Sequence, residues 1–262
     1  MRNLVIWGGP VSRSDLKVDV PLDTEVVVFN QGVGGIGSNA FRDLALSYLD
    51  ADDHILPGLL RSKGIQEEDF DRIVLAGFSA FHGMANEILK HDADRVIGLI
   101  SLDACFSSKE ALSKKGYEEF SRKAIRGEAV VVMTASLGGG QTFSTGEECV
   151  LATAEAAMSA ENVDPVALQV EGIPEPEKAF KAGDLYVLDY AGKYSHQQHV
   201  WVLAQPILNA FLLPILEGKL PSSNALQPMG TSKSNGAWGI FLGIAAALAT
   251  VGSIKLLSSG KE

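Results

Sequence analysis

Ser79 is the residue of this sequence with the clearest chemical potential. It lies near the centre of a turn, residues 77–83, between an apolar run at residues 73–76 and a helical pattern. A strand, an abrupt turn and a helix would place this hydroxyl at the carboxyl end of a sheet. There the backbone amide of Ala80 would face a negative charge forming on an attacked carbonyl. The layout predicts a nucleophile, and a serine that only caps the helix is the alternative.

The glycines of this turn depart from the usual G-x-S-x-G spacing. Gly77 supplies the first glycine, but Phe81 stands where the last would be, and the next is Gly83. Such glycines let strand and helix backbones pass closely, so Phe81 predicts a wider crossing. The irregular turn also leaves open a catalytically inactive scaffold.

A serine nucleophile needs a general base, and two histidines are placed to supply it. They follow the last predicted strand, residues 185–190, and would therefore lie at the same sheet edge as Ser79. His196 comes first, preceded by a possible cap at Ser195, and is our predicted base. His199, about one helical turn later, is the alternative. Both could instead be polar residues of an exposed first turn.

The carboxylate that orients the base is predicted to be Asp103. It is the first charged residue after the apolar run at residues 96–102, again at the carboxyl edge. A strand-end aspartate can also simply cap a loop. The next run, residues 129–134, ends without a carboxylate, so Glu147, Glu148 and Asp189 are the alternatives.

A glycine-rich turn at residues 30–37 follows a predicted strand and precedes a helical pattern. Glycines allow backbone amides to approach a ligand, so the amides of Gln31 and Gly32 are predicted to complete an oxyanion hole with Ala80. Gly32, Gly34 and Gly37 also match the dinucleotide pattern GxGxxG. An NAD(P)- or nucleotide-binding protein is therefore the alternative function, although no apolar run ends in the required acidic residue.

Composition narrows the class of protein. The 262 residues are 46% hydrophobic and 21% charged, enough for one large α/β domain. The net charge of −10 and the absence of a Lys/Arg block exclude nucleic acid as an expected partner. Cys105 and Cys149 show no metal or redox spacing and are expected to be small buried residues rather than a disulfide. We expect neither a metal nor a cofactor.

Apolar runs of strand length alternate with helical patterns along residues 1–216. The runs are near-continuous, which is typical of strands buried on both faces. The pattern predicts a doubly wound, mostly parallel α/β sheet. The expected strands are residues 4–7, 25–29, 73–76, 96–102, 129–134, 166–170 and 185–190, and the expected helices are residues 40–49, 84–90, 109–126, 147–160 and 196–216.

The character of the chain changes after this domain, which we assign to residues 1–219. Residues 220–235 are rich in Ser, Pro, Asn and Gly and are predicted to be a flexible linker. Residues 236–254 carry no charge and are long enough to span a bilayer, so residues 236–257 are predicted to be a transmembrane helix, followed by a polar tail, residues 258–262. Small residues at four-residue spacing could pair such helices. The sequence therefore predicts a single-pass, C-terminal membrane anchor with the globular domain on the cytoplasmic side.

The order of these features resembles the α/β-hydrolase superfamily: a glycine-rich turn after an early strand, a serine turn, a strand-end aspartate and a histidine after the last strand. The resemblance covers residues 1–216 and implies a Ser79, His196 and Asp103 triad. It further implies hydrolysis of an ester, thioester or amide bond in a small-molecule or lipid-like acyl substrate. In most members the acid follows the next strand, although some lipases place it where Asp103 lies.

Overall fold

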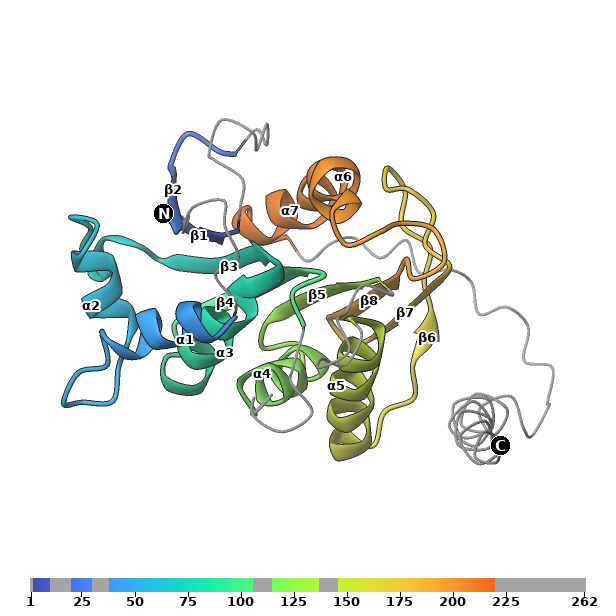
Figure 1. Cartoon of the computed structure of the whole chain (residues 1–262), viewed down its shortest axis with the longest axis horizontal. Helices are drawn as coiled ribbons and strands as arrows, with labels where there is room; N and C mark the ends of the chain where they lie inside the picture. Colours follow the sequence, from blue (N-terminus) through green and yellow to red (C-terminus); the bar gives the residue numbers. More distant parts are fainter. Residues whose placement is uncertain (1, 10–19, 30–37, 106–114, 137–145, 220–262) are drawn as a thin grey trace, which may run out of the picture. The chain divides into compact units, whose positions relative to one another are not determined.

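Strands that alternate with helices build a central sheet covered on both faces (Figure 1). The computed structural model describes residues 2–9, 20–29, 38–105, 115–136 and 146–219. All of these residues belong to one compact unit, Met1–Leu226.

The sheet has the strand order β2-β1-β3-β4-β5-β8-β7-β6. Each pairing from β2 across to β8 is parallel, while β7 runs antiparallel to β8 and β6 antiparallel to β7. The carboxyl ends of the six parallel strands therefore share one edge. The strands are β1 (Asn3–Gly8), β2 (Thr24–Phe29), β3 (Arg72–Phe78), β4 (Val96–Leu102), β5 (Val130–Ala135), β6 (Val166–Ala167), β7 (Lys178–Ala182) and β8 (Leu185–Asp189).

Successive side chains of a strand enter two separate hydrophobic cores, one on each face of the sheet. In β1, Leu4 and Ile6 belong to one core, while Val5 and Trp7 belong to the other. This two-residue period within an apolar run explains why the central strands show no polar alternation. The first core is completed by helices α1 (Ser38–Leu46), α2 (Leu56–Arg61), α3 (His82–His91), α4 (Lys115–Ile125) and α5 (Gly146–Glu161).

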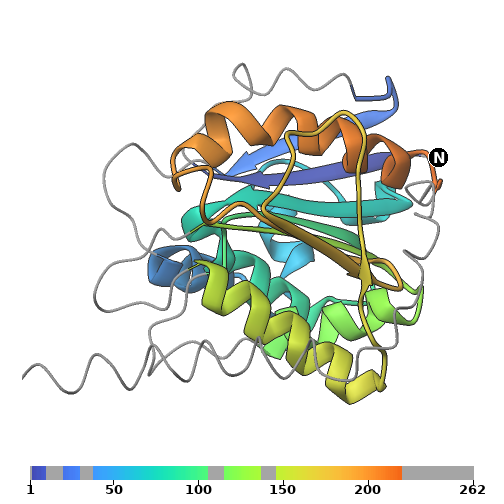
Figure 2. The same ribbon diagram turned by 90° about the vertical axis from the view of Figure 1, so that its right-hand side faces the viewer.

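The second core is closed by one helical segment that follows β8 and crosses the opposite face (Figure 2). It passes twice through π-helical turns, so its inward face is not that of a regular α-helix. Its parts are η4 (His199–Leu203), α6 (Ala204–Ile207), η5 (Leu208–Leu212) and α7 (Leu213–Leu216).

The predicted mostly parallel α/β sheet is confirmed, with two elements that the patterns did not indicate. The strand β7 has the sequence KAFKA, whose lysines obscure an apolar run, and it lies near the antiparallel edge of the sheet. The helix α2 has the sequence LPGLLR, in which a proline and a glycine resemble a turn. Its proline is tolerated because it occupies the first helical turn.

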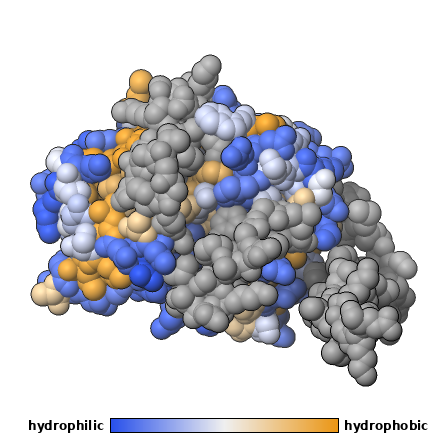
Figure 3. Space-filling model, viewed as in Figure 1, coloured by the Kyte–Doolittle hydropathy of each residue, from blue (hydrophilic) through white to orange (hydrophobic). Residues whose placement is uncertain are grey.

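The predicted linker and anchor, residues 220–262, lie outside the described residues. Among the helices that are described, none is long and apolar enough to cross a membrane. On the face seen in Figure 1, hydrophilic and hydrophobic areas are interspersed over the described surface (Figure 3). The large apolar side chains that reach the described surface include Trp201, which is 70% exposed and lies five positions after His196.

Candidate active site

The structure brings together three side chains that the sequence places far apart. The Ser79 hydroxyl oxygen lies 2.9 Å from Nε2 of His196. On the other side of the imidazole, Nδ1 lies 2.6 Å from Oδ2 of Asp103. With a proton on Nδ1 donated to the carboxylate, Nε2 accepts the proton of the serine hydroxyl. The arrangement can therefore draw a proton from Ser79 toward His196.

Ser79 occupies a sharp turn at the carboxyl end of β3. The strand ends at Phe78, a 3-10 turn covers Ser79–Phe81, and α3 follows directly. The backbone of Ser79 is left-handed, with φ of 55°. L-residues other than glycine rarely adopt this conformation, and it costs about 1–2 kcal/mol. This left-handed conformation directs the Ser79 side chain away from the backbone that connects β3 to α3.

Phe81, the residue that replaces the usual glycine, fits because two strand residues opposite it are glycines. Its ring is fully buried in the first core. A Cβ added at Gly8 would lie 1.8 Å from this ring, and one added at Gly77 would lie 2.0 Å from it. These two glycines are paired across β1 and β3. The space for the turn is therefore provided by the sheet rather than by the helix.

Asp103 follows the last residue of β4 and is fully buried. Its backbone is also left-handed, with φ of 45°. Oδ1 accepts a hydrogen bond of 3.0 Å from the backbone amide of Ser136, and Oδ2 accepts one from the Ser136 hydroxyl. The Asp103 amide donates to the hydroxyl oxygen of Thr134 at 2.9 Å. Buried carboxylates are retained when such donors satisfy them.

His196 reaches the two other side chains from the segment after β8. Its ring stacks on Phe78, with centroids 4.5 Å apart and planes 27° apart. The aromatic face limits rotation of the imidazole, while 31% of the His196 side chain stays exposed. One face of the imidazole is therefore held by Phe78, while part of the His196 side chain is open to solvent.

The structure brings His196, not His199, to Ser79. His199 is fully buried, and its Nδ1 lies 3.1 Å from the Ser195 carbonyl oxygen. Burial lowers the pKa of the His199 imidazole, and the charge of Asp103 opposes this shift. Its ring packs edge-on against Tyr190. This histidine has the contacts of a core residue.

The alternative carboxylates make other contacts or lie on other elements. Asp189 is buried at the end of β8, where Oδ1 accepts a hydrogen bond of 2.9 Å from the amide of Ala191. Its Oδ2 lies 3.6 Å from Nζ of Lys178 on β7. Glu147 belongs to the first turn of α5. None of the described contacts joins Asp189 to a histidine.

The predicted oxyanion residues are only partly described. Ala80 follows Ser79 within the 3-10 turn, while Gln31 and Gly32 lie outside the described residues. The strand that precedes them, β2, is separated from β3 by β1. The residue after β1, Gly9, has φ of 155°, and a Cβ added to it would lie 3.4 Å from Cβ of Phe78.

Gly9 is therefore a second candidate donor that the sequence interpretation missed. The signal was present as two glycines after the first apolar run, but only the sheet order shows that this run adjoins the serine strand. For the alternative dinucleotide site, the candidate acidic residues are Asp50, Asp52 and Asp53, which follow the glycine-rich turn at about the expected distance. Asp50 accepts hydrogen bonds from the amides of Asp52 and His54 within a surface loop.

The expectation for the cysteines was wrong, because Cys105 and Cys149 form a disulfide with Cα atoms 5.6 Å apart. Both are fully buried, as expected. Cys105 follows Asp103 by two residues, and Cys149 lies in α5. The bond therefore ties the segment after the carboxylate to the helix that covers it.

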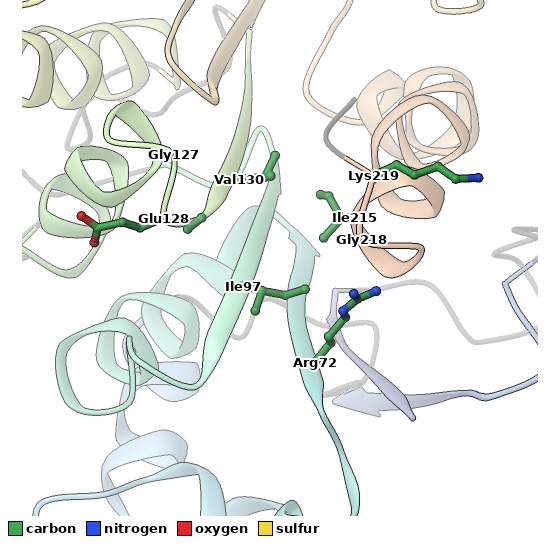
Figure 4. A pocket seen from close by; sticks show the side chains of 9 residues that line it. Arg72, Ile97, Gly127, Glu128, Val130, Ile215, Gly218 and Lys219 are labelled. Atoms are coloured by element: carbon green, nitrogen blue, oxygen red, sulfur yellow. The ribbon is translucent and has the colours of Figure 1, made fainter. Parts of the chain in front are cut away.

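A cavity of about 160 Å³ lies at the opposite edge of the sheet (Figure 4). Its lining includes Arg72, the first residue of β3, whereas Ser79 follows the other end of that strand. Seven residues of strand separate them by roughly 20 Å. The Arg72 guanidinium donates to the Leu216 carbonyl at 2.6 Å, and this hydrogen bond joins the start of β3 to the end of α7. This cavity is separate from the three side chains.

No family model matches this sequence, and comparison with curated proteins gives no match either. Within the described ranges, no group of three or more His, Cys, Asp or Glu side chains could hold a metal ion. A function for this protein therefore has to be inferred from the geometry around Ser79.

Proposed function

We propose that this protein is a serine hydrolase that cleaves an ester, thioester or amide bond through Ser79, His196 and Asp103. The observation that carries the proposal is the unbroken series of contacts from the Ser79 hydroxyl through the imidazole to a buried carboxylate. A serine that only capped a helix would need neither an imidazole at 2.9 Å nor a left-handed backbone.

In the proposed reaction, the Ser79 oxygen attacks the carbonyl carbon of the substrate. Its proton moves to Nε2 of His196, and the Asp103 carboxylate stabilises the imidazolium that forms. Collapse of the tetrahedral intermediate expels the leaving group, which takes the proton from Nε2. Water then repeats the sequence on the acyl-enzyme, releases the acid and restores the Ser79 hydroxyl.

The negative charge on the tetrahedral oxygen needs backbone donors. The amide of Ala80 meets this need, because it follows the nucleophile at the start of the turn that leads into α3. The second donor comes from a glycine-bearing loop. Gln31 and Gly32 are the donors predicted from sequence, and Gly9 is the one favoured by its position beside Phe78.

The strand arrangement favours an α/β-hydrolase type of fold for this proposal. The serine follows an interior strand, the acid follows the neighbouring strand β4, and the histidine follows β8, the last parallel strand. All three then meet at the carboxyl edge, where ligands of parallel sheets bind. The substrate class in this proposal is a small-molecule or lipid-like acyl compound.

We also propose that residues 236–254 anchor the protein to a membrane, on the basis of their length and lack of charge. The disulfide bears on which side of the membrane the globular domain faces, because such bonds persist in oxidising compartments. It favours a globular domain that faces such a compartment over the cytoplasmic side expected from sequence. Carbonate should leave the full chain in the membrane fraction but release a variant with Ala246→Arg and Leu248→Arg.

A fluorophosphonate probe tests the proposed nucleophile directly, because it reacts covalently with activated serines. We expect the full chain to be labelled, with the adduct located on Ser79 by mass spectrometry, and Ser79→Ala to remain unlabelled. Ser62→Ala is the matched control, since the Ser62 hydroxyl donates to the Leu59 carbonyl and none of its described contacts is with the triad. An unlabelled wild-type chain would favour an inactive scaffold, and labelling that survives Ser79→Ala would refute the assignment.

A further inference from the structure

Ser136 binds both oxygens of the carboxylate that orients His196. Its backbone amide donates to Oδ1 of Asp103, and its hydroxyl donates to Oδ2. Oδ2 is also the atom that lies 2.6 Å from Nδ1 of the imidazole. Ser136 and Asp103 are both fully buried, so water cannot readily replace a donor that is lost.

The fold explains why a serine is found at this point. Ser136 follows the last residue of β5, and Asp103 follows the last residue of the neighbouring strand β4. In the register of these strands, Leu102 is paired with Thr134. The two strand ends therefore bring a hydroxyl to the carboxylate from the side. The resemblance to α/β-hydrolases would place the acid at the position that Ser136 occupies.

We propose that Ser136 is a positioning residue, which holds the Asp103 carboxylate in the plane that His196 requires. The inference rests on the proposed hydrolase function and extends it to a fourth side chain. A carboxylate bound at both oxygens cannot rotate freely about its Cβ–Cγ bond. Without the hydroxyl, Oδ2 keeps a single described donor, and the direction of the Nδ1 contact is less well determined.

The test is a kinetic double-mutant cycle on the full chain with a short acyl ester. Ser136→Ala retains the backbone donor and removes only the hydroxyl. We expect kcat to fall roughly 10- to 100-fold with KM little changed, since a hydrogen bond to a charged group is lost. In an Asp103→Ala background the same change should cost less than about twofold, because the group through which Ser136 acts is gone.

Ser101→Ala is the matched control. Ser101 is also buried near the end of β4, but its hydroxyl contacts the Tyr117 hydroxyl at 3.4 Å, not the triad. It should leave kcat close to that of the wild type. If Ser136→Ala does not fold, as judged by thermal unfolding, Ser136→Gly removes the same hydroxyl and takes its place in the cycle.

Two outcomes would overturn the inference while leaving the hydrolase proposal intact. One is a wild-type rate in Ser136→Ala when Ser79→Ala is inactive. The other is an equal loss from Ser136→Ala with and without Asp103, which would place its effect elsewhere. Activity that persists in Ser79→Ala would instead refute the hydrolase proposal itself, whatever the cycle shows.

Discussion

The two edges of the parallel sheet use left-handed backbone in different ways. At the amino edge, Gly127 precedes β5 and Gly183 precedes β8, and both have positive φ. Glycine adopts this conformation at little cost. Among the described residues of the carboxyl edge, Gly9 has positive φ too, but so do Ser79 and Asp103, for which the conformation is unfavourable. Two turn residues away from His196, Asp53 and Asn162, also have positive φ, but Asp and Asn tolerate this conformation better than Ser does. The least favourable left-handed backbone is therefore that of Ser79, whose side chain contacts His196.

The left-handed backbone of Ser79 supports the proposed active site at the carboxyl edge. Side chains that contact the imidazole must come from residues with a Cβ, so glycine cannot substitute there. The cores on both faces stabilise these two unfavourable backbones, as expected for a functional site.

The largest effect is expected from the histidine at the carboxyl edge. His196→Ala removes the group that accepts the Ser79 proton, so kcat for a short acyl ester should fall at least about 10³-fold. His199→Gln should lose far less, because His199 contacts the Ser195 carbonyl rather than the nucleophile. Steady-state kinetics of both variants decide this. A greater loss in His199→Gln would mean that the base is His199.

The disulfide should provide the next largest effect, on stability. Joining Cys105 to Cys149 closes a loop with a sequence separation of 44 residues. In the chain-entropy treatment such a loop stabilises the folded state by about 4 kcal/mol. Replacing both cysteines by Ala should lower the free energy of unfolding by up to this amount, as measured by urea denaturation at 25 °C.

An ion-pair variant at the amino edge is the control for the disulfide. Arg126 pairs with Glu128 and Glu161 on the surface, and Arg126→Ala should barely move the urea midpoint. If the double cysteine variant were equally little affected, the disulfide would not constrain the unfolded chain. If the double variant folds but loses activity, the disulfide would instead act by holding the segment of Asp103, which lies two residues before Cys105.

The parts of the structure that sequence could predict are those set by local patterns. The bounds predicted for β4 agree with the structure because its residues are apolar except for Ser101 and are flanked by the charged residues Arg95 and Asp103. Ser79, Asp103 and His196 could each be singled out as polar residues just beyond predicted strands. Their mutual distances depend on strand order, which no local pattern contains.

The parts that could not be predicted depend on contacts between distant segments. Ser136 follows an apolar run, as Asp103 does, yet its contact with Asp103 depends on the pairing of β4 with β5. The spacing of Cys105 and Cys149 resembles no motif, and their bond depends on how α5 packs. Gly8 follows the predicted strand at residues 4–7, and only the pairing of β1 with β3 shows that it leaves room for the ring of Phe81.

A smaller effect should appear when the two kinds of left-handed residue are exchanged. Ser79→Gly relieves strain and should raise the free energy of unfolding by about 0.5–1 kcal/mol while abolishing activity. Gly127→Ala introduces strain at the amino edge and should lower the free energy of unfolding by about 1 kcal/mol, with activity retained. A Cβ at Gly127 would meet nothing closer than 3.9 Å, so strain alone is tested.

Urea denaturation of both variants measures the contrast. If Ser79→Gly is less stable than the wild type, the left-handed serine is favoured by its contacts, and the proposed strain at the carboxyl edge is absent. If Gly127→Ala is neutral, the amino edge has no need of glycine there.

The smallest effect concerns pH and the buried His199. Burial lowers the pKa of this imidazole in the folded protein, below the value near 6.5 of an exposed histidine. As pH falls below about 6.5, the unfolded chain binds a proton that the folded chain does not, so the free energy of unfolding decreases. Above this range both forms are neutral and the contribution is constant. The wild type should therefore lose stability between pH 7.5 and 5.5, and His199→Gln should reduce that loss because glutamine does not titrate. Urea denaturation at both pH values measures the difference, and an equal loss in the two proteins would mean that His199 is protonated as easily when folded as when unfolded.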